Sequence, residues 1–325
     1  MKVALLYNQP LAQAPDAADV LDQVKLVESA LNQTGTACRV FALPPDWPGV
    51  KREWDGLTAY APDVVFNLVE ALGADARGQA RIAGLLELSG WAFTGSGSQA
   101  LVQTTDKALT KSVLAACGLP TPAWQVVREL PGRTIVPGPW IIKPLAEDAS
   151  VGIDEDAVVR NAGELIPRLT DKLSRFSGQG LLLETFLEGR EFNVSLLERV
   201  PGRVEALPPA EIKFEAWPAG QPRLLTYRAK WDPAAFEYRH TPRAFVPAGA
   251  LAAELQDLAT ACWRAFGLRG YARVDFRQDQ SGKLWVLEVN ANPCLSPDAG
   301  FMAAVKERGL SPGEAIQTIM EAAAY

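Results

Sequence analysis

The sequence predicts an α/β protein, because two kinds of segment alternate along its first part. Short apolar runs that suit buried strands alternate, over roughly the first hundred residues, with segments in which apolar residues recur every three or four positions. This alternation is typical of parallel strands joined by helices. The expected strands are residues 2–7, 37–43, 63–68 and the start of 91–98, and the expected helices cover Val20–Leu31 and residues 79–88.

Composition and charge narrow the class of protein further. The chain has 325 residues, 48% of them hydrophobic, so it can bury a sizeable core and is long enough for two or three domains. Its 38 acidic and 32 basic residues give a net charge of −6, which argues weakly against nucleic acid or an anionic membrane as a partner. We see no signal peptide and no run long enough to span a bilayer, so we expect a cytoplasmic protein.

Cysteine and histidine usage restricts the chemistry. The cysteines are scattered without CxxC spacing, which disfavours both disulfides and a thiolate metal site. His240 is the single histidine, so a multi-histidine zinc site is excluded and any Ser-His-Asp triad would have to use this residue. We therefore expect chemistry based on carboxylates and lysines.

The character of the sequence changes near residue 100, where we place a domain boundary. A helix follows, with Thr105 as its expected N-cap, Asp106 favouring its N-terminus and Gly118 at its end. The proline-rich residues 201–247 are expected to form loops and short strands around the site. A long amphipathic helix is expected over residues 251–266.

Two strands near the C-terminus place polar side chains on one face. If Asp275 lies opposite Glu288, the same register sets Arg273 against Asn290, because side chains alternate across a strand. Asp275, Glu288 and Asn290 then offer the oxygen ligands that Mg²⁺ prefers, and Arg273 could hold an anion beside them. A solvated polar face is the alternative interpretation. The opposite, apolar face is expected to carry Ala272, Val274, Phe276, Leu287 and Val289.

Other segments allow both a phosphate-binding and a plain structural interpretation. Lys107 and Lys111 could both be surface charge. This interpretation suits Lys111 better than Lys107, because Lys107 lies where a helix N-terminus would also favour phosphate. Lys143 ends an apolar strand and is either solvated there or placed to meet an anion. Residues 147–153 form either a loop over phosphates or a plain turn, and residues 181–197 either a hairpin or an edge that binds a nucleotide base.

In order and spacing, these segments resemble the ATP-grasp superfamily, and within it the D-alanine:D-alanine ligases. The resemblance begins near Val64 and is carried by DVVFNLVEALGADARGQ, FTGSGSQAL, DKALTK, IIKPLAEDASVGI, LLLETFLEGREFNVSLL, PPAEI, YRAKW, FVPA, GYARVDF and LEVNANPCLS. It implies an ATP-grasp fold. A Rossmann-like domain over residues 1–103 would precede a central domain over 104–182 and a C-terminal domain over 183–325, with ATP clasped between the last two.

The resemblance also implies roles for individual residues. ATP phosphates would be contacted by Lys107, Lys143 and Lys230, and covered by a loop that contains Ser150. The adenine would meet Glu184 and the backbone of Leu187, and the ribose would meet Glu191. Two Mg²⁺ ions, or Mn²⁺ in their place, would be held by Asp275, Glu288 and Asn290, and Arg273 would steady the transferred phosphate and the tetrahedral intermediate.

The implied activity is that of an ATP-dependent ligase that forms a carbon–nitrogen bond. ATP would phosphorylate a small-molecule carboxylate, and an amine would attack the acyl phosphate to give an amide. Neither nucleic acid nor membrane is an expected partner, and both a monomer and a homodimer stay open.

The chain departs from the dialanine ligase pattern in its expected substrate contacts. The N-terminal Gly-Gly turn with its Ser and Glu is absent, although Asp16 or Asp19 could replace the missing acid. Cys294 stands where the family has glycine, and we expect a passive role for it. Ala299 stands where the family has a serine that holds the second substrate's carboxylate. We therefore expect substrates other than two D-alanines, with a true dialanine ligase and a non-catalytic nucleotide-binding protein as the alternatives.

Overall fold

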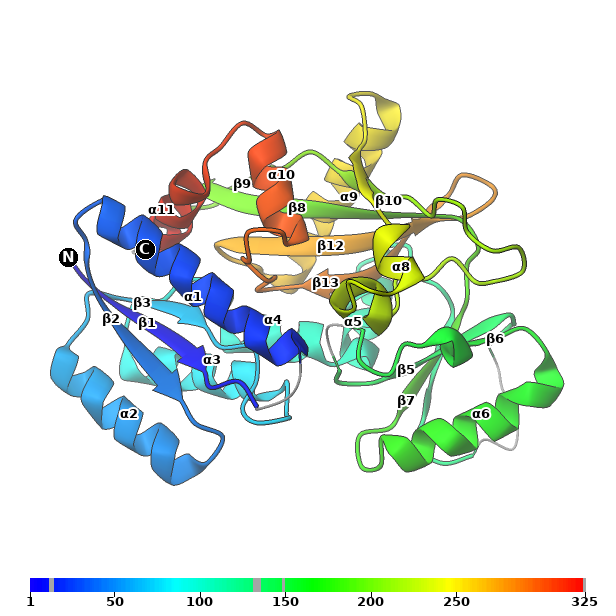
Figure 1. The fold of residues 1–325 in the computed structure, drawn as a ribbon, viewed down its shortest axis with the longest axis horizontal. Helices are drawn as coiled ribbons and strands as arrows, with labels where there is room; N and C mark the ends of the chain where they lie inside the picture. Colours follow the sequence, from blue (N-terminus) through cyan, green and yellow to red (C-terminus); the bar gives the residue numbers. More distant parts are fainter. Residues whose placement is uncertain (12–14, 131–135, 148–149, 324–325) are drawn as a thin grey trace.

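The structure is a computed structural model that describes residues 1–11, 15–130, 136–147 and 150–323, with the backbone alone over residues 15–18. Its described strands form three sheets. Figure 1 shows the first sheet and the central section below the large third sheet, on opposite sides of the molecule. Among the described residues, no helix is long and apolar enough to cross a bilayer.

The N-terminal sheet is parallel, in the order β2-β1-β3, as the alternation of strands and helices predicts. The apolar β1 lies in the middle, where Val3, Ala4, Leu5 and Leu6 are fully buried. The expected strand after residue 91 is reduced to a single parallel bridge between Val65 and Phe93. The elements are β1 (Lys2–Asn8), α1 (Pro15–Gln33), β2 (Ala37–Leu43), α2 (Trp47–Tyr60), β3 (Val64–Leu68) and α3 (Gly78–Ser89).

Two helices lead into the central section. The expected N-cap of the second is wrong by one residue: Asp106, not Thr105, accepts from the N–H groups of Ala108 at 2.9 Å and Leu109 at 3.2 Å. Thr105 instead ends the preceding helix, whose existence the sequence did not reveal. These helices are α4 (Ser98–Thr105) and α5 (Lys107–Ala116).

The central section forms an antiparallel sheet in the order β4-β7-β5-β6. The hairpin interpretation of residues 181–197 is wrong, because β7 pairs here while β8 belongs to the large sheet. The boundary expected at residue 182 falls inside β7, so we propose that the central section extends to Thr185. The elements are β4 (Trp124–Val127), β5 (Trp140–Pro144), a 3-10 turn (Glu155–Ala157), β6 (Val158–Val159), α6 (Ala162–Arg175) and β7 (Leu181–Thr185).

The third sheet has the order β11-β10-β8-β12-β13, with β9 paired to β8. The proline-rich region supplies short strands, as expected, and also α7 and α8. Helix α9 packs its expected apolar face against the sheet. The elements are β8 (Arg190–Val200), β9 (Arg203–Ala206), β10 (Ala210–Ile212), α7 (Tyr227–Trp231), α8 (Phe236–Arg239), β11 (Arg243–Phe245), α9 (Ala250–Phe266), β12 (Tyr271–Gln278) and β13 (Leu284–Asn290).

The C-terminal helices α10 (Gly300–Glu307) and α11 (Pro312–Ala323) return to the N-terminal section. Figure 1 shows α11 beside α1, and α10 next to α11 and β8. One buried cluster joins Val24 and Leu31 of α1 to Ile316 of α11, and contains Leu197 and Tyr271 of the large sheet. The C-terminal segment after β13 therefore packs against both α1 and the large sheet.

Candidate active site

The register predicted for the β12–β13 hairpin is confirmed. Arg273 pairs with Asn290 and Asp275 pairs with Glu288. A bulge then shifts the register, so that Phe276 lies opposite Val286. The prediction for Leu287 is wrong, because the extra residue of a bulge interrupts the alternation and Val286 takes its place in the buried core.

Arg273 and Asp275 form a bidentate ion pair on this face. Arg273 Nε lies 2.7 Å from Asp275 Oδ1, and Nη2 lies 2.8 Å from Oδ2. Burial alone would lower the pKa of Arg273, but the charge of Asp275 raises it above its usual value. Asn290 Nδ2 donates to Asp275 Oδ2 at 3.3 Å. The three side chains are thus one connected group.

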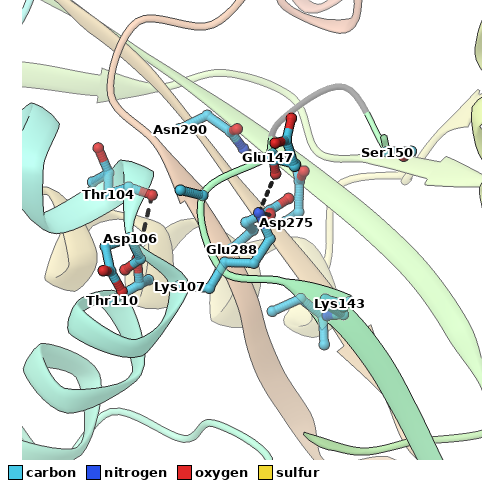
Figure 2. Close-up of polar contacts among 12 residues, drawn as sticks. Thr104, Asp106, Lys107, Thr110, Lys143, Glu147, Ser150, Asp275, Glu288 and Asn290 are labelled. Carbon is cyan, nitrogen blue, oxygen red and sulfur yellow. Dashed lines mark hydrogen bonds and ion pairs between the residues drawn. The ribbon is translucent and has the colours of Figure 1, made fainter. Parts of the chain in front are cut away.

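Glu288 completes this face and is surrounded by cations. Its Oε1 lies 3.3 Å from Lys107 Nζ. Burial would raise the pKa of Glu288, yet Lys107, Lys143 and Lys230 together hold it at about 2. Figure 2 shows Lys107 reaching from the start of α5 towards Glu288 and Asp275. Glu288 is therefore a carboxylate at neutral pH.

The donor set of this face fits a hard divalent cation. Two carboxylates and the amide oxygen of Asn290 are the oxygen ligands that Mg²⁺ prefers. Within the described ranges, no three His, Cys, Asp or Glu residues come together to hold a metal. A metal here would therefore take its third protein ligand from Asn290.

Lys107 links the helix N-terminus to the loop after β5. Its backbone N–H donates to Leu145 O at 3.0 Å, and its Nζ donates to the carbonyl oxygen of Glu147. The surface interpretation does not hold for this lysine, which is 5% exposed. The Lys107 ammonium therefore lies between a carbonyl oxygen of the loop and the Glu288 carboxylate of the β12–β13 face.

Glu184 directs its carboxylate to two lysines. Its Oε1 lies 2.5 Å from Lys111 Nζ and its Oε2 lies 2.7 Å from Lys143 Nζ. Burial would raise the pKa of Glu184, but the lysines lower it. The surface interpretation of Lys111 is wrong, because its side chain is 1% exposed. Lys143 is not solvated either, and contact of Glu184 with adenine stays a prediction.

Arg277 was missed as a site residue and holds two of the predicted ones. Its Nη1 donates to Leu187 O at 3.2 Å, and its Nη2 pairs with the Glu191 carboxylate. Arg277 is 2% exposed. The alternation of β12 could have revealed it, since Arg277 follows Arg273 and Asp275 at every second position.

Lys230 and Ser150 lie on two segments that are joined to each other. Ser150 Oγ donates to Leu225 O at 3.1 Å, and Tyr227 N donates to Ile153 O at 3.2 Å. Burial and then the charge of Arg273 lower the pKa of Lys230, at the end of α7. The loop after β5 is therefore hydrogen-bonded to the segment that carries α7, although residues 148–149 lie outside the described part.

The expected substrate anchor on α1 is already engaged. Asp19 Oδ2 accepts from Cys294 Sγ at 2.7 Å, and Oδ1 accepts from Ser296 Oγ at 2.6 Å. Burial raises the pKa of Cys294, so its thiol stays neutral. Asp19 thus holds the segment before α10, and the side chain of Asp16 lies outside the described residues.

Comparison with solved structures defines the class of fold. The D-alanine–D-alanine ligase from Bacillus anthracis, complexed with ATP, superposes with a TM-score of 0.76 over 99% of this chain and 97% of that chain, at 18% identity. The enzyme from Coxiella burnetii gives a TM-score of 0.71 over 99% and 94%, also at 18% identity. The fold is the ATP-grasp fold that the resemblance implied.

Sequence comparison gives the family. The D-ala D-ala ligase C-terminus profile matches residues 113–321. The uncharacterized protein y4sG of Sinorhizobium fredii is 33% identical over 80% of this chain and 74% of its own length, and the D-alanine–D-alanine ligase of Pseudomonas fluorescens is 34% identical over 74% and 69%. The chain belongs to the D-alanine–D-alanine ligase family, and is an ATP-dependent ligase that forms a carbon–nitrogen bond.

Proposed function

We propose that this ligase joins a carboxylate to an amine through an acyl phosphate, and that it acts on amino-acid-like substrates other than two D-alanines. The observation that carries the proposal is the β12–β13 face, where Asp275, Glu288 and Asn290 lie beside Arg273 and a ring of lysines. The arrangement offers positioning and charge neutralisation without a histidine or a covalent nucleophile, which is what phosphoryl transfer requires.

The proposed reaction has two chemical steps. An oxygen of the substrate carboxylate attacks the γ-phosphorus of ATP, and the bond to ADP breaks. The amine nitrogen then attacks the carbonyl carbon, loses a proton, and inorganic phosphate leaves. Arg273 stabilises the negative charge on the transferred phosphate and on the tetrahedral intermediate. Lys107, Lys143 and Lys230 neutralise the phosphates of ATP.

The metal ligands are proposed as Asp275, Glu288 and Asn290. Bound Mg²⁺, proposed as two ions, would neutralise the charge that develops on the phosphates. Glu288 suits this role because its pKa of about 2 keeps it ionised.

We also propose that Glu184, Leu187 and Glu191 bind the nucleoside. Arg277 keeps Leu187 and Glu191 in position. Ser150 is proposed to cover the phosphates.

Two features support substrates other than two D-alanines. Ala299 lies directly before α10 and offers no side-chain hydrogen bond there. Asp19, which could replace the missing N-terminal acid, already accepts hydrogen bonds from Cys294 and Ser296. A site that leaves a substrate's charged groups unpaired discriminates against that substrate, because their desolvation is not compensated.

The test is ADP formation with Mg²⁺ over a matrix of carboxylic acids and amines, with millimolar D-alanine alone as one member. We expect turnover with another pair of substrates and little with D-alanine alone. Robust turnover with recovery of the D-alanyl dipeptide would instead make this a true dialanine ligase. Binding of ATP without ADP formation in any member would favour the non-catalytic alternative.

We also propose that this ATP-consuming enzyme works in the cytoplasm. Light scattering would decide between a monomer and a homodimer.

A further inference from the structure

A buried lysine lies on the apolar face of α6. Leu165, Leu169 and Lys172 are buried residues of this helix, and their spacing at i, i+4 and i+7 places them on one face. The two leucines belong to the core of the central section. Lys172 takes the position of a third apolar residue, yet it is 1% exposed. A lysine is almost never fully buried unless its ammonium is paired, so the partners of Lys172 indicate its role.

The Lys172 ammonium binds the loop that follows β5. Its Nζ donates to Gly152 O at 2.8 Å and lies 3.1 Å from Asp154 Oδ1. Within the loop, Ile153 N donates to Ser150 O at 3.0 Å, so this stretch forms one hydrogen-bonded turn. Hydrogen bonds from a charged donor are roughly twice as strong as neutral ones. The ammonium therefore holds, from the side of α6, the turn that carries Ser150.

Packing brings the same turn close to the end of α6. Gly152 has a φ of +74°, and a β-carbon there would lie 2.5 Å from Phe176 Cζ and 2.8 Å from Pro144 Cγ. The backbone of the turn therefore lies tightly between the end of β5 and the C-cap residue of α6. In this close position the carbonyl oxygen of Gly152 reaches Lys172.

The contact with Gly152 is the stronger of the two that Lys172 makes. The side chain of Asp154 is 42% exposed, and Arg175 Nη1 also lies 3.6 Å from its Oδ2. Exposed ion pairs contribute little, because water screens them. The Gly152 carbonyl oxygen, in contrast, accepts from an ammonium that is almost fully buried. Without that ammonium, the turn would keep its hydrogen bonds to the segment that carries α7 but lose the hold from α6.

We propose that Lys172 is a positioning residue for ATP, which holds the turn of Ser150 where the turn covers the phosphates. Without the ammonium the turn would occupy several positions, and ATP would bind tightly only to molecules in which the turn is seated. The apparent Kd for ATP rises as that fraction falls. This inference rests on the proposed role of Ser150, and it deepens that role by naming the residue, on another element, that sets the position of the turn.

Hydrogen exchange measures the hold on the turn directly. Lys172→Met removes the ammonium but keeps a long side chain beside Leu165 and Leu169. The amide of Ile153, which donates to Ser150 O, is the reporter. We expect this amide to exchange roughly tenfold faster in Lys172→Met, as for a lost hydrogen bond to a charged group, while the amides of β5 change little. Mass spectrometry of the exchanged peptides, without nucleotide, gives the rates.

A pair of ligands separates positioning over the phosphates from general damage to the site. Adenylyl imidodiphosphate, an ATP analogue that resists hydrolysis, carries the phosphates that the turn covers, whereas adenosine carries none. In binding titrations with Mg²⁺, Lys172→Met should raise the Kd for the analogue roughly tenfold and change that for adenosine little. Equal weakening of both ligands would make Lys172 a structural residue of the central section and overturn the inference.

Arg168→Met is the matched control within the same helix. Arg168 Nη1 lies 2.9 Å from Asp156 Oδ2, so the change also removes a cation that pairs with the segment after β5, but beyond the turn. The exchange of Ile153 and the binding of the ATP analogue should both stay as in the wild type. A loss in Arg168→Met as large as that in Lys172→Met would show that the effect is not specific to the buried lysine.

Gly152→Ala displaces the turn from its own side, because the added β-carbon has no room beside Phe176 and Pro144. It should speed the exchange of Ile153 as Lys172→Met does. If both changes act through the hydrogen bond between Lys172 and Gly152, the double variant should exchange no faster than the faster single variant. Additive effects would assign the two changes to separate contacts and contradict the inference.

Neither measurement depends on turnover, so the inference and the proposed function can fail separately. If no carboxylate and amine support ADP formation, the ligase proposal fails, but selective loss of the ATP analogue in Lys172→Met still supports the role of Lys172. Unchanged exchange at Ile153 overturns the inference. Faster exchange with unchanged binding of the analogue also overturns it, because the turn would then be held by Lys172 without serving the nucleotide.

Discussion

Glu184 and Lys111 form an ion pair of 2.5 Å in which both side chains are 1% exposed. Lys111 Nζ also donates to Thr121 Oγ1 and to Leu287 O, both at 2.9 Å. This lysine thereby connects β7 of the central section to β13 of the large sheet. Its contacts are structural, whereas Lys143 on the other side of Glu184 is 11% exposed.

We predict that Lys111→Met destabilises the protein by about 1–3 kcal/mol, because the buried Oε1 of Glu184 and the Leu287 carbonyl oxygen lose their partner, although Lys143 still neutralises the carboxylate. Denaturant unfolding, followed by circular dichroism, measures the change. Lys51→Met is the control, since the ion pair of Lys51 with Asp55 lies on the surface with side chains 63% and 67% exposed. It should change stability by less than about 1 kcal/mol. Similar midpoints for the two variants would show that the buried pair contributes nothing.

The same cluster predicts acid sensitivity. Although burial opposes it, Lys111 and Lys143 lower the pKa of Glu184 in the folded state, so the unfolded chain binds this proton more readily. The stabilisation is complete above the unfolded value of about 4.5 and is lost as the pH falls towards the folded value. We expect a drop in melting temperature below about pH 4.5, and a shallower drop for Glu184→Gln. An unchanged slope in that variant would assign acid unfolding to other groups.

Lys143→Ala should act on the nucleotide more than on the fold, because Lys111 remains to neutralise Glu184. Loss of a charge-assisted phosphate contact worth about 1.5–3 kcal/mol should raise the Kd for ATP roughly 10- to 150-fold. Isothermal calorimetry measures the Kd, and an unfolding curve checks the fold. ATP binding equal to that of the wild type would remove Lys143 from the phosphate site.

Glu288→Gln should abolish Mg²⁺-dependent ADP formation while leaving the fold intact. The change removes a carboxylate whose pKa of about 2 keeps it charged, but it leaves the apolar face with Val274 and Val289 untouched. Glu321→Gln, on the exposed side of α11, is the control and should retain full activity. Undiminished turnover of Glu288→Gln would contradict the metal assignment.

The sequence predicted those parts of the site that depend on the period of a strand. Alternation alone set Asp275 opposite Glu288 and Arg273 opposite Asn290, and the register is confirmed up to the bulge. The bulge at Leu287 was not predictable, because an extra residue is fixed by the partner strand and not by a local pattern. Arg277 was within reach of the same alternation but was not recognised.

Contacts between distant segments were beyond sequence reasoning. Lys111 follows Lys107 by one helical turn, and only the packing of α5 against β13 shows that it is buried. Asp19 and Cys294 are 275 residues apart, and their hydrogen bond depends on how the C-terminal segment returns to α1. Lys172 lies on the face of α6 that carries leucines, and no local pattern indicated that its ammonium binds the loop after β5.

Ala299→Ser is predicted to change both stability and substrate choice. Ala299 is the N-cap of α10, with extended φ and ψ of −60° and 156° and no side-chain hydrogen bond. A serine there can accept from the first N–H groups of the helix, which should raise the free energy of unfolding by about 0.5–2 kcal/mol. Ala303→Ser is the control within the same helix. It should not stabilise the protein, because serine in a helix interior has a lower propensity than alanine.

The hydroxyl would also restore the donor that dialanine ligases offer to the second substrate's carboxylate. With D-alanine as acceptor, we expect kcat/KM for Ala299→Ser to rise roughly tenfold or more, because a hydrogen bond to a charged group is worth about 1.5 kcal/mol or more. The KM for ATP should stay the same, since Ala299 is not among the residues proposed to contact ATP. A gain in stability without a gain in D-alanine turnover would show that the cap forms but that position 299 does not govern substrate choice. We would then assign the discrimination against D-alanine to Asp19, because its hydrogen bond with Cys294 already engages the acid that could replace the missing N-terminal anchor.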